Sequence, residues 1–205
     1  MRGLMVLLIV PIAACGGGGG GGGGSGIDPR LARVDVYEAQ RVRVLGDPGA
    51  GVVGMAATET ADVPITGAIT YDGSVTISVE TSVPIFLAGD AAITMDFAAG
   101  DVSGEMRNMF GRREGQALQD YAGTLVIADG TVDDANGWSV DYAGTLESGS
   151  DTLVFAGQVV GSLYGAEAEA IAGAEFGALI DVNGDIVDGS LTIVAEEEGG
   201  ASDVD

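Results

Sequence analysis

Hydrophobic and polar residues alternate along most of the chain from residue 65 onward, and turn residues interrupt the alternation at short intervals. A period of two is typical of strands that bury one face. Many short strands joined by glycine-containing turns indicate an all-β barrel or sandwich, and closure into a barrel would leave no exposed strand edge. The predicted strands are Ile65–Tyr71, Val75–Val79, Ala91–Phe97, Val102–Met106, Gly123–Ala128, Trp138–Leu146, Leu153–Tyr164, Ile171–Ile180 and Ser190–Val194.

Turn residues predict how some of these strands are connected. Asp72-Gly73 stands between two alternating runs, which is a strong signal for a hairpin. Ala99-Gly100-Asp101 predicts another turn. Only Glu167 to Ile171 has a helical pattern, for about one turn.

Residues 27–62 are expected to form a leading segment that packs on the main domain, residues 63–205, which ends in an acidic tail. Valines at positions 34, 36, 42 and 44 alternate with polar residues, which predicts short strands. Asp47-Pro48-Gly49 predicts a turn after them.

The first 26 residues have the layout of an exported, tethered protein. Arg2 precedes an apolar run from Leu4 to Ile12, which is too short to span a bilayer, and small residues lead to Cys15. This pattern resembles the lipobox of bacterial lipoproteins, so residues 1–14 are expected to be a signal peptide and Cys15 to be lipidated. The alternative is an ordinary secretory signal with an unrelated cysteine. Residues 15–26, nearly all glycine after Cys15, would form a flexible tether of about 20 Å.

Charge and composition exclude several classes of function. The chain has 8 basic and 31 acidic residues, no histidine, and a net charge of −23, so binding to nucleic acid is not expected and membrane attachment would depend on acyl chains. Without histidine, Ser-His-Asp catalysis and histidine-ligated zinc are excluded, whereas hydrolysis by a pair of carboxylates is not. The single cysteine excludes an internal disulfide. One Trp and five Tyr are too few for the aromatic girdles of a membrane barrel.

Two stretches of the sequence carry motifs that go beyond strand alternation. The first is Ala88 to Asn108, which contains Met95-Asp96-Phe97 and Val102-Ser103-Gly104. The second runs from Val160 to Phe176 and carries the proposed fold signature: Gly161, Tyr164, Gly165 and Gly173. Together they resemble the transferrin-binding protein B superfamily of Gram-negative surface lipoproteins. The resemblance covers about residues 64–195 and implies a single antiparallel β-barrel of about eight strands, surface display, and capture of a ligand that is often linked to iron or haem supply. The family members that take iron from transferrin are usually two-lobed, whereas this chain has room for one barrel.

A predicted loop from Glu105 to Gln116 is the leading candidate for ligand binding. Arg107, Arg112 and Arg113 cluster there with Met109 and Phe110, although the chain is strongly acidic. Apolar side chains could contact a flat partner while arginines bind its carboxylates. Haem has an apolar plane and carboxylates, and in a protein without histidine its iron could take only Tyr or Met as a ligand, or none from the protein. The alternative is a mobile connection whose arginines pair with nearby acids.

A second candidate lies at Asp181, Asn183 and Asp185, which have the spacing of the first calcium ligands in an EF-hand loop. Position six of that loop would be Ile186 instead of glycine, and position twelve Thr192 instead of glutamate. Asn183-Gly184 is also a favoured pair for a type I′ hairpin, and this interpretation is preferred.

The sequence therefore predicts a non-enzymatic lipoprotein, anchored in the outer membrane and exposed at the cell surface, that binds haem, an iron-related solute, a host protein or an outer-membrane receptor through its barrel loops. The first alternative is a structural or adhesive envelope lipoprotein without a small ligand. A carboxylate-dependent hydrolase is a weaker alternative.

Overall fold

The structure is a computed structural model that describes residues 28–198. The predicted signal peptide, the lipidated Cys15, the glycine tether and the end of the acidic tail lie outside the described residues. Within the described part, no helix is both long and apolar enough to cross a membrane.

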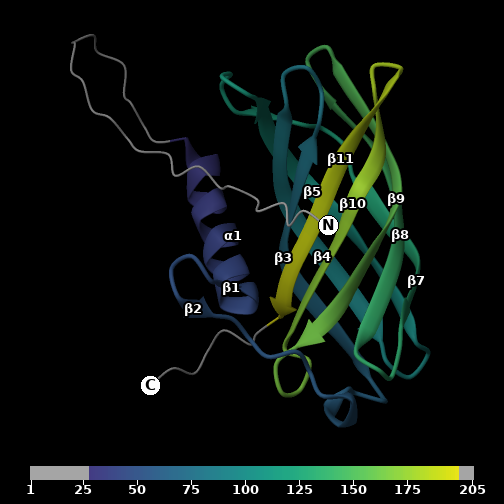
Figure 1. Cartoon of the computed structure of the whole chain (residues 1–205). Coiled ribbons are helices and arrows are strands. Elements are labelled where there is room, and N and C mark those ends of the chain that lie inside the picture. The colour runs from purple at the N-terminus through teal and green to yellow at the C-terminus, as the bar shows by residue number, and fades with distance from the viewer. Residues whose placement is uncertain (1–27, 199–205) are drawn as a thin grey trace, which may run out of the picture.

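Eight long antiparallel strands form one closed barrel (Figure 1). Each strand pairs with the next along the chain, and β3 pairs with β11 to close the ring. The predicted single antiparallel barrel of eight strands is confirmed. The barrel strands are β3 (Ala68–Val79), β4 (Ile85–Asp96), β5 (Asp101–Arg113), β7 (Leu125–Val132), β8 (Gly137–Ser148), β9 (Asp151–Tyr164), β10 (Ala170–Val182) and β11 (Asp185–Glu197).

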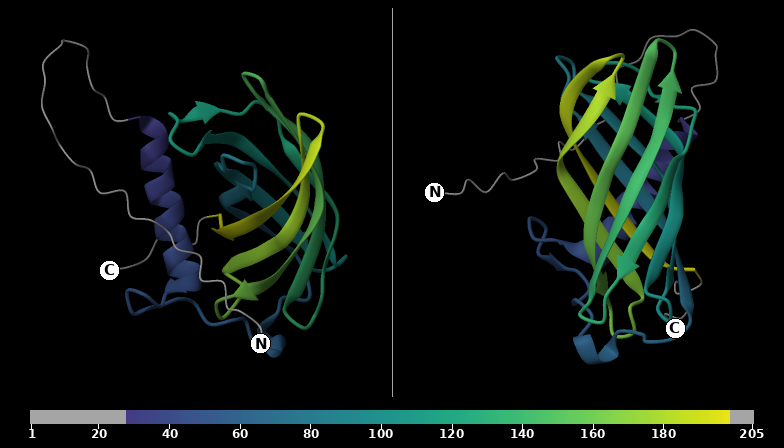
Figure 2. Two further views of the ribbon diagram at one scale, coloured as in Figure 1. Left: turned by 45° about the horizontal axis from the view of Figure 1, so that its top comes forward. Right: turned by 90° about the vertical axis from the view of Figure 1, so that its right-hand side faces the viewer.

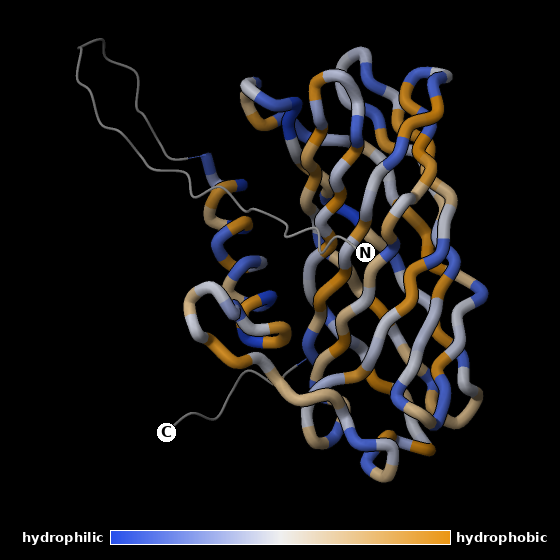
Figure 3. The backbone as a smooth tube through the Cα atoms, viewed as in Figure 1, coloured by the Kyte–Doolittle hydropathy of each residue, from blue (hydrophilic) through white to orange (hydrophobic). Residues whose placement is uncertain are grey.

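Apolar side chains fill the barrel interior. Along β4, every second residue from Ile85 to Met95 is buried, and the residues between them are more exposed. Hydrophobic and more polar residues alternate along the barrel strands (Figure 3). Equivalent residues of the other strands join them in one continuous core. Because the interior is occupied by the protein's own side chains, ligands are expected to bind at the ends or on the outer surface.

One polar pair lies at the edge of this core, where Tyr142 is buried and Glu175 is partly buried. The Tyr142 hydroxyl donates a hydrogen bond of 2.7 Å to Oε2 of Glu175. Gly157 makes room for the pair, since a Cβ there would lie 2.3 Å from the Glu175 carboxylate. Burial and then the bond to Glu175 raise the pKa of Tyr142, which keeps its hydroxyl protonated as the donor.

Three of the proposed signature residues have a clear structural role. A Cβ on Gly161 would lie 2.4 Å from the Trp138 ring, and one on Gly173 would lie 2.6 Å from it, so the two glycines accommodate the indole. Gly165 has a φ of +90° in the turn after β9, which favours glycine. Tyr164 is half-buried on the outer side of the barrel, in the cluster around Val44.

Two local predictions about turns and helices are wrong. Asp72-Gly73 does not turn the chain, because β3 runs through it without interruption. A Cβ on Gly73 would lie 2.1 Å from the carbonyl oxygen of Val194, so this glycine permits close packing of β3 against β11. Glu167 to Ile171 is not helical either: residues 165–169 connect two strands, and β10 begins at Ala170.

The short strands predicted around the valines of the leading segment are replaced by a helix, α1 (Pro29–Leu45). Asp28 caps its start by accepting a hydrogen bond of 3.0 Å from the Arg30 backbone N–H, and Pro29 suits the first turn. The helix ends at Leu45, and the residue that follows it, Gly46, has a φ of +77°.

Helix α1 lies along the outside of the barrel (Figure 2). Its contact residues recur at intervals of three and four, and most are polar. Arg30 forms an ion pair with Asp120, Gln40 donates to the carbonyl oxygen of Asp72 at 3.0 Å, and Arg43 forms an ion pair with Glu196. Val44 is fully buried against Ala170, Ala172 and Val194 on the outer face of β10 and β11.

The connection from α1 to the barrel crosses one end of it (Figure 1). It contains β1 (Gly46–Asp47), β2 (Val52–Val53) and the short helix η1 (Thr60–Asp62). Val63 joins the barrel core, and the Thr58 hydroxyl donates to the carbonyl oxygen of Gly165 at 2.8 Å. The other end of the barrel carries the candidate site.

Candidate functional site

The predicted loop from Glu105 to Gln116 is instead the second half of β5, which continues to Arg113. A bulge interrupts its pairing with β4: Ala88 is opposite Phe110 and Asp90 is opposite Arg107, so two residues face Gly89. The extra residue is Asn108, with a φ of +53°. The bulge reverses the alternation, so that Met109 points into the barrel and Phe110 points outward, under α1.

Phe110 and Asn108 are the centre of the contact with α1. The Arg33 guanidinium lies 4.7 Å from the centre of the Phe110 ring, and the Tyr37 ring stacks beside it at 6.4 Å. Asp90 accepts hydrogen bonds from Arg33 at 2.9 Å, from the Asn108 amide at 2.7 Å, and from the Tyr37 hydroxyl. The network attaches α1 to β4 and β5.

The protonation states in this network are well defined. Burial opposes ionisation of Asp90, but the hydrogen bonds from Tyr37, Asn108 and Arg33 outweigh it and hold the pKa of the carboxyl below its ordinary value. Burial, followed by the bond to Asp90, raises the pKa of Tyr37 to about 12. At neutral pH the carboxylate is therefore ionised and the phenol is neutral.

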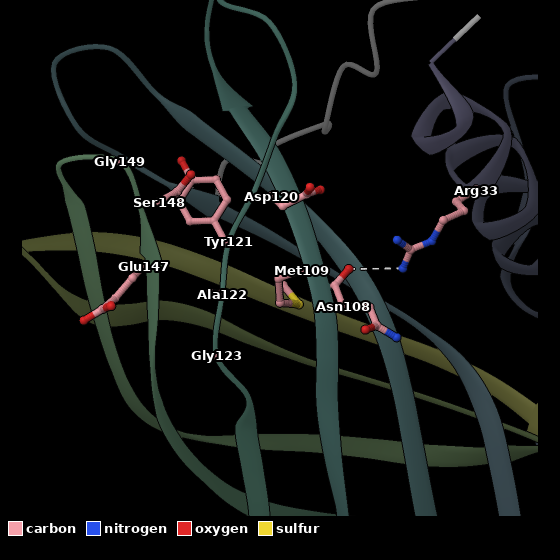
Figure 4. A pocket seen from close by; sticks show the side chains of 10 residues that line it. All are labelled: Arg33, Asn108, Met109, Asp120, Tyr121, Ala122, Gly123, Glu147, Ser148 and Gly149. Atoms are coloured by element: carbon pink, nitrogen blue, oxygen red, sulfur yellow. Dashed lines mark hydrogen bonds between the residues drawn. The ribbon is translucent and has the colours of Figure 1, made fainter.

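An open cleft of about 510 Å³ lies beside this network (Figure 4). Here β7 pairs with β5 only from Asp101 to Met106. In the segment before β7, the short strand β6 (Gln119–Asp120) pairs with β5 at Phe110 and Gly111, whereas Ala122 pairs with Glu147 of β8. Gly123 permits this path, since its φ is +127° and a Cβ would lie 2.1 Å from the Thr145 carbonyl oxygen. We call it the α1 cleft; its lining residues are Arg33, Asn108, Met109, Asp120, Tyr121, Ala122, Gly123, Glu147, Ser148 and Gly149.

The lining of the α1 cleft offers mainly hydrogen-bond acceptors. Arg33 already donates to Asp90, to the Tyr37 hydroxyl and to the carbonyl oxygen of Asn108. The Asp120 and Glu147 carboxylates and the Ser148 hydroxyl remain for a ligand, although Asp120 also pairs with Arg30. Asp120 and Glu147 point away from each other (Figure 4), which is not the arrangement of a hydrolytic carboxylate pair.

The five residues of the predicted ligand loop are not brought together. Met109 lines the α1 cleft but is only 1% exposed, and Phe110 is also 1% exposed, behind Arg33. Arg107 pairs with Glu105 at the surface, Arg113 pairs with Asp151 in the barrel mouth, and Arg112 is exposed. Two of the three arginines, Arg107 and Arg113, therefore pair with nearby acids, as the alternative interpretation expected.

These positions do not suit haem. Its apolar plane needs exposed apolar side chains, and Met109 and Phe110 are both buried. The arginines that would bind its propionates face in different directions, and two are already neutralised. Haem binding through this group of residues is therefore not supported.

The calcium-like sequence forms a two-residue hairpin between β10 and β11, as the preferred interpretation predicted. Asn183 and Gly184 have φ values of 56° and 96°, as a type I′ turn requires. Oδ1 of Asp181 accepts from the Gly184 N–H at 2.6 Å, and Oδ1 of Asn183 accepts from the Thr152 N–H at 2.9 Å. Between residues 28 and 198 no group of three or more acidic, His or Cys side chains is arranged to hold a metal ion.

The sequence interpretation missed the residues of α1, above all Arg33 and Tyr37. A usable signal existed: Arg30, Arg33, Tyr37, Gln40 and Val44 are spaced by three, four, three and four residues, as on one face of a helix. Because four of the five are polar or amphipathic, hydrophobic periodicity did not identify that face.

No protein-family profile and no curated protein matches this sequence. Solved structures of transferrin-binding protein B are similar in fold. A double mutant of the vaccine antigen from Haemophilus parasuis Hp5 has 16% identity and a TM-score of 0.47 over 69% of this chain and 28% of that one. A single mutant of the same antigen has 20% identity and a TM-score of 0.46 over 69% of this chain and 29% of that one. Intact Ap-TbpB, with N and C lobes, has 18% identity and a TM-score of 0.46 with the same coverage.

The similarity concerns the barrel fold alone. This chain spans less than a third of the length of those proteins. The similarity assigns no ligand to this chain.

Proposed function

We propose that this chain is a lipid-anchored protein of the Gram-negative outer membrane that is displayed at the cell surface and binds its ligand at the α1 cleft. The observation that carries the proposal is the filled barrel interior, because it leaves the outside of the barrel as the place for a ligand. The α1 cleft, an open hollow of about 510 Å³ beside helix α1, is such a place.

The chemistry of the α1 cleft favours a ligand with amino or guanidino groups. Asp120, Glu147 and Ser148 supply oxygen acceptors, and Arg33 is already engaged with Asp90. Charge-assisted hydrogen bonds to carboxylates are the strongest that such a site could form. Such groups occur on a basic segment of a host or envelope protein and on a small cationic solute, and both remain candidates.

Membrane attachment is supported by the sequence before Asp28. The apolar run, the small residues before Cys15 and the glycines that follow fit export, lipidation and a flexible tether. The acidic barrel would not adhere to anionic lipids without such an anchor. A Cys15→Ala variant should therefore leave the envelope fraction or accumulate unprocessed.

The filled interior also favours a second candidate function, a structural or adhesive envelope lipoprotein that has no small ligand. The two functions differ in whether the α1 cleft contacts a specific molecule in cells.

Site-specific photo-crosslinking in the cells that produce the protein tests this difference. A photoreactive residue replaces Ser148 in the α1 cleft, and a control replaces Asp129, which is exposed on β7. We expect a discrete adduct at position 148 that is absent at 129 and is reduced by Glu147→Gln. No adduct at 148, or the same adducts at both positions, would refute binding at the α1 cleft.

A further inference from the structure

The cations of the described residues are confined to helix α1 and strand β5. No lysine or arginine follows Arg113 in the sequence, so all the charged residues of β7 to β11 are acidic. The arginines within residues 28–198 lie on α1 and β5, and all except Arg112 form ion pairs. Two of these pairs are with acids of the wall formed by β7 to β11: Arg113 with Asp151, and Arg43 with Glu196. The other acids of this wall have no arginine partner among the described ion pairs, so the wall carries a strong excess of negative charge.

This acidic wall also carries the most exposed aromatic side chain of the described residues. Phe176 is 84% exposed and Leu179 is 61% exposed, both on the outer face of β10. Val160 and Val154 of the adjacent strand β9 are 59% and 43% exposed. We call these four residues the β9–β10 patch. A cluster of exposed apolar side chains on one face is typical of an interaction surface.

The backbone explains why the patch is exposed. The pairing of β9 with β10 stops at Ala174 and Val160 and resumes at Ile180 and Phe155. Opposite β11, Gly177 is an extra residue between Phe176 and Ala178, with a φ of +78°. Because the bulge shifts the alternation by one residue, Phe176 and Leu179 both face outward.

Acids border the patch on both sides. Asp188 of β11 is directly opposite Leu179 and is exposed. On the other side, Asp141 of β8 is directly opposite Gln158 of β9 and accepts a hydrogen bond of 3.0 Å from it. The patch thus combines an apolar centre with a carboxylate rim and no cation of its own.

We propose that the β9–β10 patch docks an extended basic segment of another protein, in which Lys or Arg residues stand next to aromatic or aliphatic ones. The apolar side chains of the partner would pack on Phe176 and Leu179, and its cations would pair with Asp141 and Asp188. This surface is distinct from the α1 cleft and does not depend on the function proposed for it. A second copy of this chain is disfavoured as occupant because it would bring the same acids, and an anionic membrane surface is disfavoured for the same reason.

The proposal can be tested with two synthetic peptides of equal charge, one alternating Lys with Leu and one alternating Lys with Ser. Fluorescence anisotropy at about 150 mM salt gives both affinities for the wild-type protein. We expect the Lys–Leu peptide to bind about tenfold more tightly, and Phe176→Ser with Leu179→Ser to abolish the difference. Asp141→Asn with Asp188→Asn should weaken both peptides.

The matched control is Phe86→Ser with Val126→Ser, since these side chains are 49% and 54% exposed on other strands. This control should keep the preference for the Lys–Leu peptide. Equal binding of the two peptides by the wild type, or an unchanged preference in the Phe176 and Leu179 variant, would overturn the proposal. Two further outcomes would overturn the proposal. If the wild type self-associates and only the Phe176 and Leu179 variant does not, the patch binds a second copy of this chain. If the wild type binds anionic vesicles and only that variant does not, the patch binds lipid.

Discussion

Asn108 decides which side chains of β5 face α1 and which face the barrel interior. Its left-handed conformation adds one residue to the strand, which turns Phe110 toward Arg33 and directs Met109 and Arg113 inward. Its amide also donates to Asp90, so one residue both shifts the alternation and takes part in the network that the shift creates. Asparagine tolerates this backbone region better than most residues do.

Arg113 and its neighbour Arg112 should differ sharply in their contribution to stability. Arg113→Gln should lower the free energy of unfolding by about 3 kcal/mol, because it leaves Asp151, whose side chain is 10% exposed, without its cation. Arg112→Gln is the matched control, since Arg112 is exposed and forms no ion pair within residues 28–198, and it should change stability by less than about 0.5 kcal/mol. Urea unfolding measures both, and equal costs would contradict a stabilising role for the Arg113–Asp151 pair.

At this scale the sequence predicts local turn chemistry well and long-range partners poorly. Asn183-Gly184 was predictable because the dipeptide itself carries the preference for that turn. The bulge at Asn108 was not predictable from the sequence. The buried methionines at 106 and 109 are three residues apart, which breaks the alternation, and in a sequence such a break looks the same as the start of a loop. Gly161 and Gly173 could be identified from their pattern, but the Trp138 ring between them could not.

Helix α1 is attached to the barrel by contacts that respond to pH at both ends of the scale. Asp90 has a lowered pKa, so its contribution is complete above its ordinary pKa of 3.8 and is lost as the pH falls below that value. Tyr37 has a pKa raised from 10.0 to about 12, so its contribution is complete below pH 10 and is lost between pH 10 and 12.

Asp90→Asn should therefore reduce the loss of stability on acidification, and Tyr37→Phe should reduce the loss at alkaline pH. Free energies of unfolding measured from about pH 3 to 12 give both slopes. The control is Asp35→Asn, on the exposed side of α1, which should change neither. If Asp90→Asn and Asp35→Asn gave the same acid slope, Asp90 would not be the residue that couples α1 to pH.

Strands and helices that pack through apolar side chains could be predicted from the sequence, whereas those that pack through polar side chains could not. The barrel strands follow an alternation of buried apolar residues, which a sequence displays directly, and their number and closure were confirmed. Helix α1 contacts the barrel mainly through Arg30, Arg33, Tyr37 and Gln40. Its valines at positions 34 and 36, which predicted strands, are exposed.

For the whole molecule, the uneven charge distribution creates two opposing responses to salt. Salt weakens the ion pairs between α1 and the barrel, but it also screens the repulsion within a chain of net charge −23. Surface ion pairs contribute little individually, whereas the repulsion involves the whole acidic wall.

We therefore expect added NaCl to stabilise the protein. Raising its concentration from about 20 mM to about 500 mM should raise the melting temperature by roughly 5 °C. The control is an equal osmolality of a neutral solute, which does not screen charge. A melting temperature that falls with NaCl would mean that the ion pairs of α1 outweigh the repulsion.

The pairing of β3 with β11 makes completion of the fold depend on the last strand to be synthesised. Tyr71 and Glu197 are neighbours in the sheet, although almost the whole barrel lies between them in sequence. Until residues near 197 have left the ribosome, β3 and β10 have no partner on one side and the barrel cannot close. The barrel of a chain with this topology therefore stays open for most of its synthesis. A truncation that removes only β11 would leave two open strand edges that favour aggregation, so it would be nearly as damaging as the loss of several strands.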